Sequence, residues 1–101
     1  MARVIVDHVF DPPMSEEQQA EFARRLDPCL EVRNGAWRRS AISKDRRRMT
    51  CEFEAPDAET VREALRSAKV PFESAWSVDV YAVEDFPELK AKLDELVAKK
   101  P

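Results

Sequence analysis

The sequence predicts an α+β fold of the ferredoxin-like type, a β-α-β-β-α-β sandwich built on a four-stranded antiparallel sheet. Two observations predict this class. Four segments alternate apolar and polar residues with the period of two that is typical of half-buried strands. Helical patterns separate the first strand from the second and the third from the fourth. Right-handed crossovers then give the strand order 4-1-3-2, with both helices on one face of the sheet.

The length of the chain fits one small domain with one core. A chain of 101 residues can bury roughly two thirds of its unfolded surface. We expect residues 1–84 to form the ferredoxin-like part and residues 85–101 to form a helical extension of the same domain.

Composition and charge exclude several classes of function. The chain has 17 basic and 20 acidic residues, and the basic ones are scattered apart from one cluster, which argues against a general nucleic-acid binder. No run approaches the ~18 apolar residues of a membrane span, so no membrane partner is expected. The single glycine, Gly35, excludes a glycine-rich phosphate loop. Because the N-terminus begins a strand rather than a signal peptide, we expect a cytoplasmic protein with free thiols at Cys29 and Cys51.

The first strand and helix are predicted from residues 3–31. Residues 3–10 alternate, and Ser15 with Gln18 forms a capping box at the start of the helix. Proline removes a backbone donor and clashes with the preceding turn, so Pro28 should end the helix near Asp27 or restart it there. The apolar stripe of this helix consists of Phe22, Ala23, Leu26 and Leu30.

The second and third strands form a hairpin in this prediction. Asn34-Gly35 ends the first helix, and residues 36–42 form the second strand. A polar turn over residues 43–46 leads directly into the third strand, residues 48–54. The short connection makes these two strands antiparallel neighbours.

Two more helices and one strand complete the chain. Asp57 is the N-cap of the second helix, whose apolar face carries Val61, Ala64, Leu65 and Ala68. Residues 74–82 form the fourth strand. Asp85 and Glu88 cap the last helix, whose apolar side carries Phe86, Leu89, Leu93, Leu96 and Val97.

One face of the predicted sheet has no helices on it. A domain this small usually covers such a face with a second copy of itself, so we expect a homodimer. The last helix offers two other solutions, since it could cover the face of its own chain or reach across to a partner subunit.

Three pieces of the sequence carry a family resemblance. RVIVDHVF has a histidine near the end of the first strand, MTCEFEAPDAETVREAL has a cysteine three residues before Glu-Ala-Pro, and VPFESAWSVDVY forms the last strand. Together they resemble the small bacterial nickel-binding-protein-like family of undefined function. The likeness covers residues 3–81, and its most specific piece is Cys-x-x-Glu-Ala-Pro.

This resemblance implies a dimer of the dimeric α/β barrel type. It also implies nickel or another divalent transition metal as a ligand, with His8 and Cys51 as candidate metal-site residues. Family members carry a second histidine beside the first, where this chain has Val9.

We expect His8 and Cys51 to lie on the two central strands and on one face, so a shared metal site is one interpretation. Asp7 and Glu52 would then supply additional oxygen ligands. The other interpretation is that both are core residues, a hydrogen-bonded histidine and a cysteine that packs as a small apolar side chain.

The opposite face of the strands is predicted to be polar. If a partner subunit encloses it, its carboxylates need arginine or a cation to stay charged, and such a pocket could serve acid/base chemistry. Alternatively, the charges are simply solvated. The residues placed on this face are Asp7, Glu52, Glu54, Asp79, Arg38, Ser40 and Tyr81.

The one basic cluster of the sequence surrounds the predicted hairpin. It could bind an anionic ligand or an acidic partner surface, or it could be a charged hairpin tip that discourages stray strand pairing. Its candidate residues are Arg38, Arg46, Arg47 and Arg48, with Arg39 and Lys44 beside them.

Three functions therefore stay open at the level of sequence. The first is a homodimer that binds a divalent transition metal or a small ligand at the sheet. The second is a cofactor-independent enzyme, of isomerase, lyase or monooxygenase type, in which a histidine and a carboxylate transfer protons on a small organic molecule. The third is a regulatory or interaction module that uses the basic cluster and the last helix.

Overall fold

The order of elements in the computed structural model is the predicted one, followed by the extra helix. The structure describes residues 1–85 and 87–99. Its elements are β1 (Ala2–Val9), α1 (Glu16–Glu31), β2 (Ala36–Ile42), β3 (Arg48–Ala55), α2 (Ala58–Ser67), β4 (Ser74–Val78), the 3-10 turn η1 (Val83–Asp85) and α3 (Pro87–Ala98).

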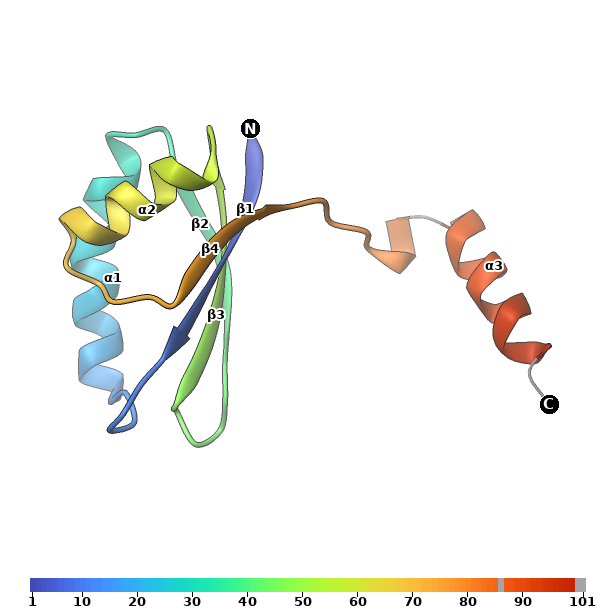
Figure 1. Cartoon of the computed structure of the whole chain (residues 1–101), viewed down its shortest axis with the longest axis horizontal. Helices are drawn as coiled ribbons and strands as arrows, with labels where there is room; N and C mark the ends of the chain where they lie inside the picture. The colour runs from blue at the N-terminus through green and yellow to red at the C-terminus, as the bar shows by residue number, and fades with distance from the viewer. Residues whose placement is uncertain (86, 100–101) are drawn as a thin grey trace.

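The sheet has four antiparallel strands in the order β2-β3-β1-β4, which confirms the predicted order 4-1-3-2 and the α+β fold class. The central strands β1 and β3 pair so that Val6 lies opposite Cys51 and His8 lies opposite Met49. Helices α1 and α2 lie together on one face of the sheet (Figure 1). We call this the helix face and the other the open face.

The core fills the space between the helix face and the two helices. Alternate residues of β1 and β3 point into it and meet the apolar stripes of α1 and α2, because a strand presents every second side chain to one face. Each large apolar side chain buried in this way contributes about 1.5–3 kcal/mol. The largest fully buried side chains are those of Phe53, Leu26, Leu30, Leu65, Val4, Val6, Val61 and Cys51.

Helix α1 continues without a break through Pro28, so the prediction that it ends near Asp27 or restarts there is wrong. Leu26 and Leu30 on either side of the proline are both buried, and their packing outweighs the backbone hydrogen bond that proline cannot make. The helix ends as predicted around Asn34-Gly35. Asn34 has a φ of 58°, and the Leu30 carbonyl accepts hydrogen bonds from the N–H groups of Arg33 at 2.9 Å and Gly35 at 2.8 Å, which closes the end of the helix.

Strand β4 is shorter than predicted, because β1 begins at Ala2 and offers no residues that could pair with the chain much beyond Val78. It ends at Val78, which pairs with Arg3, close to the start of β1. The chain then continues as an extended segment through η1 to α3.

Helix α3 stands away from the sandwich, at the end of this segment (Figure 1). Of the described elements it contacts only η1, so it does not cover the open face of its own chain. Three residues of the predicted helical extension, Phe86, Lys100 and Pro101, lie outside the described residues. Within the described part of the chain, no helix is long and apolar enough to cross a membrane.

Candidate functional site

The predicted metal-site residues lie on two different faces of the sheet. His8 and Cys51 share the helix face with Val6 and Met49, and they are only 2% and 1% exposed. Asp7 and Glu52 alternate with them and therefore lie on the open face. The sequence-based expectation that His8 and Cys51 share a face agrees with this register, but the four residues do not surround one point.

His8 is held as a neutral imidazole in the core. Its Nδ1 lies 2.7 Å from the Pro71 carbonyl oxygen, and because a carbonyl only accepts, Nδ1 carries the proton. Burial lowers the pKa of His8 below its ordinary value, and this effect exceeds the opposing effects of the Pro71 carbonyl and of Asp7. The ring stacks on Phe10. Among the described residues, none is recorded as a hydrogen-bond partner of Nε2.

Cys51 is held as a thiol. Burial raises its pKa to about 11, despite the hydrogen bond that the Ser40 hydroxyl donates to Sγ over 3.0 Å. Ser40 lies on β2, whereas Pro71 precedes β4, so these bonds draw Cys51 and His8 toward opposite edges of the sheet. Cys29 and Cys51 are both free thiols, as predicted.

The position of Ser40 corrects one prediction. Ser40 was placed on the open face, but it pairs with Cys51 and bonds to its sulfur. The reason is an irregularity between Trp37 and Arg39, where Arg38 is an extra residue in β2 and shifts the alternation of the strand by one. A single sequence gives no signal for such a bulge.

On the open face, Asp7 is an oriented and ionised carboxylate. It accepts hydrogen bonds from Thr50 Oγ1 at 3.0 Å, Ser74 Oγ at 3.1 Å and Trp76 Nε1 at 3.5 Å. Partial burial alone would raise the pKa of Asp7, but the three hydrogen bonds and nearby Arg48 together lower it. Asp7 therefore stays charged at neutral pH.

A chain of ion pairs crosses the same face beside Asp7. Arg3 bridges Glu52 at 2.7 Å and Glu54 at 3.0 Å, Arg39 contacts Glu52 at 3.3 Å, and Arg38 contacts Glu54 at 3.0 Å. The hydrogen bond from Arg38, with the charge of Arg3, lowers the pKa of Glu54. We call these five residues the arginine–glutamate network. Three guanidinium groups against two carboxylates leave it one positive charge in excess.

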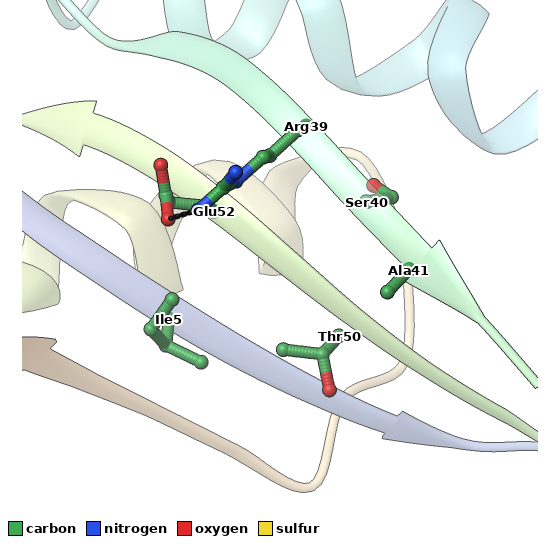
Figure 2. A pocket seen from close by; sticks show the side chains of 6 residues that line it. All are labelled: Ile5, Arg39, Ser40, Ala41, Thr50 and Glu52. Atoms are coloured by element: carbon green, nitrogen blue, oxygen red, sulfur yellow. Dashed lines mark hydrogen bonds and ion pairs between the residues drawn. The ribbon is translucent and has the colours of Figure 1, made fainter. Parts of the chain in front are cut away.

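A groove of about 340 Å³ opens on this face next to the network. Figure 2 shows its lining, with the Arg39–Glu52 pair at one end and an apolar and hydroxyl floor. The lining residues are Ile5, Arg39, Ser40, Ala41, Thr50 and Glu52. The groove thus combines a fixed charge pattern with space for a small molecule.

The predicted basic cluster is dispersed by the fold. Arg46 turns toward the start of α1 and donates to the Met14 carbonyl and to Gln19, both at 2.5 Å. Arg47 pairs with Asp11 at 3.2 Å, and Arg38 belongs to the arginine–glutamate network. Arg48 lies at the end of β3 with its charge near Asp7.

Sequence reasoning missed Arg3, the arginine of the network that contacts both Glu52 and Glu54. A usable signal existed, since Arg3 shares a strand face with Asp7 and lies directly opposite Glu54 in the register. The histidine and carboxylate of the predicted acid/base pair are not brought together, because His8 lies on the helix face.

The described residues do not fit a nickel site within one chain. They contain no group of three or more histidine, cysteine, aspartate or glutamate side chains that could hold a metal ion. Nickel prefers several imidazole or thiolate ligands, and this chain has one histidine.

Comparison with known proteins places the chain in a family. The family described as "Nickel responsive protein SCO4226-like" matches residues 4–78. The chain belongs to this family. Its fold is similar to the crystal structure of SCO4226 from Streptomyces coelicolor A3(2), with a TM-score of 0.72 and 16% identity over 80% of this chain and 100% of that chain. No curated protein is significantly similar to the chain.

Proposed function

We propose that this member of the nickel-responsive family binds a small organic anion in the groove on the open face, as a homodimer. One observation carries the proposal, the excess positive charge of the arginine–glutamate network at the end of the groove. An anion bound there would neutralise the one positive charge that the network has in excess.

Arg39 is the group that would bind the anion. Its side chain is 74% exposed, and its contact with Glu52 is the longest in the network. When Arg39 turns toward a ligand, Glu52 keeps Arg3 as its partner at 2.7 Å, so no carboxylate loses its counter-charge. A guanidinium can hold a carboxylate with two parallel hydrogen bonds, which fixes the orientation of the ligand.

A second copy of the chain would exclude water from this site. The open face exposes 50% of Trp76 and carries the half-buried side chains of Ile5 and Val78. Covering it would bury apolar surface and strengthen the attraction between Arg39 and an anion, because the local dielectric falls.

The test is a calorimetric titration with succinate and benzoate, with phosphate as an inorganic comparison, together with light scattering for mass. We expect succinate or benzoate to bind a dimer, with at least about tenfold weaker binding by Arg39→Gln, which corresponds to 1.4 kcal/mol. Arg47→Gln is the matched control, since its partner Asp11 lies at the hairpin end, outside the groove. Equal binding by the two variants, or none by the wild type, would refute the proposal.

Nickel or another divalent transition metal is the second candidate ligand, and the orientation of His8 favours it. An imidazole that donates Nδ1–H to a backbone carbonyl and leaves Nε2 free is the usual arrangement of a metal-binding histidine. Cys51 could join it only by releasing Ser40 and losing a proton, which its high pKa opposes.

This candidate is separated from the first by titrating chelator-treated protein with nickel and zinc. Micromolar binding that disappears in both His8→Ala and Cys51→Ala, but not in Arg39→Gln, would support the metal. Binding that is lost in Asp7→Asn instead would place a metal on the open face. A folded dimer that binds neither ion would leave the anion as the ligand to pursue.

A further inference from the structure

Helix α3 carries an apolar stripe that no described element covers. Leu89 is half-buried, but Leu93 and Leu96 are 43% and 51% exposed and Val97 is 68% exposed. These residues are spaced three and four apart and therefore lie on one side of the helix. An isolated helix of 12 residues is only marginally stable in water without tertiary packing, so we expect this stripe to pack against a partner surface.

The helix is an addition to the common fold. The family match ends at residue 78, and the whole SCO4226 chain is matched by 80% of this one. Figure 1 shows α3 on the side of the sheet opposite to α1 and α2, carried outward by the segment that leaves β4. It therefore projects into the space that a second copy on the open face would occupy.

The charges of the arm and of the open face are complementary. Residues 79–88 contain Asp79, Glu84, Asp85 and Glu88 and no lysine or arginine. The arginine–glutamate network on the open face has one positive charge in excess. The acidic segment thus matches the arginines of the network, and the apolar stripe matches the side chains of Ile5, Trp76 and Val78. The Asp7 carboxylate on the same face already accepts hydrogen bonds from its own chain.

We propose that α3 of each copy packs across the open face of the other copy, with its apolar stripe on Ile5, Trp76 and Val78. Two-fold symmetry makes the same contact twice. Both helices, each about 18 Å long, therefore contribute buried area to the interface, and a stable interface buries roughly 1,200–2,000 Å². This contact rests on the proposed function only because it uses the same face of the sheet. The partner's α3 would then also cover the groove.

A mixed cross-linking experiment tests the exchange. In a Cys29→Ser background, one chain carries Val97→Cys at the edge of the stripe and a second carries Thr50→Cys on the open face; Cys51 is buried. We expect a short bismaleimide to join the two different chains after mixing. Cross-links only between two Val97→Cys chains would overturn the inference in favour of helix pairing. Cross-links only when both cysteines are in one chain would show that α3 covers its own sheet.

Sedimentation of charge variants gives an independent measurement. Leu93→Glu with Leu96→Glu should weaken the dimer at least about tenfold. Ala91→Glu, an exposed position on the other side of α3, should leave it unchanged. Equal dimerisation of both variants would overturn the inference. Anion binding tests the proposed function separately: a dimer that cross-links in exchange but binds no anion would refute that function and leave the role of α3 intact.

Discussion

The two faces of one sheet hold their ionisable groups in opposite states. On the helix face, burial keeps His8 and Cys51 neutral, since it lowers the pKa of the imidazole and raises that of the thiol. On the open face, hydrogen bonds and guanidinium groups lower the pKa of Asp7 and Glu54 and keep both charged. Neighbouring residues of the same strand, Asp7 and His8, belong to different chemical environments.

This difference separates stability from recognition. The helix face is dry and closed, so its side chains contribute mainly by packing. The open face has a groove and charged side chains, and no helix among residues 1–85 and 87–99 covers it, so a ligand or partner can reach it. Substitutions on the two faces should accordingly differ in which measurement they change.

The largest contrast is expected between two residues of β3. Phe53→Ala removes a fully buried ring that packs against Trp37 and should cost about 3–5 kcal/mol of unfolding free energy. Thr50→Ala, on the open face, removes one hydrogen bond to Asp7 and should cost about 1 kcal/mol or less. Urea denaturation of both variants measures the difference, and similar losses would show that the open face is as tightly packed as the core.

The pH dependence of stability should reveal the buried histidine. The folded-state pKa of His8 lies below its ordinary value of 6.5. Below pH 6.5 the imidazole is therefore protonated in the unfolded state but still neutral in the folded state. Stability is therefore complete above pH 6.5 and falls as the pH drops toward the folded-state pKa, by at most about 1.4 kcal/mol per unit. The carboxylates with lowered pKa, Asp7 and Glu54, affect the pH dependence of stability mainly around and below their ordinary pKa values of 3.8 and 4.5.

Urea titrations between pH 5 and 7.5 measure this slope. His8→Asn is the control, because its amide can still donate to the Pro71 carbonyl but does not titrate in this range. The slope should decrease in the variant, where only the carboxylates contribute close to pH 5. If wild type and variant have equal slopes, His8 does not titrate on unfolding as its burial implies.

The sequence pattern was enough to predict which strand residues lie on which face of the sheet. Period-two alternation placed His8 and Cys51 on one face and Asp7 and Glu52 on the other, and the hairpin and capping signals fixed the order of elements. The sequence could not show that Arg38 is an extra residue in β2, that Leu26 and Leu30 carry α1 through a proline, or that β4 stops where β1 runs out of partners. Each depends on contacts between segments distant in the chain.

A smaller effect is expected within the arginine–glutamate network. The Arg3–Glu52 pair is partly buried, with side chains 33% and 10% exposed. A double-mutant cycle of Arg3→Ala and Glu52→Gln should give a coupling of roughly 0.5–1 kcal/mol that decreases with added salt. The control cycle uses Arg24 and Glu21 on the surface of α1, where coupling should be close to zero. Equal coupling in both cycles would mean that the network is an ordinary surface feature.

The smallest effect on stability should come from Arg39, and this would sharpen the contrast between the faces. Its side chain is mostly in water and its contact with Glu52 is long, so Arg39→Ala should change the unfolding free energy by less than about 0.5 kcal/mol. Denaturation without ligand measures this directly. A loss above 1 kcal/mol would show that Arg39 is needed to neutralise Glu52. It would then not be free to turn toward an anion, because releasing it would leave a poorly exposed carboxylate with one partner instead of two.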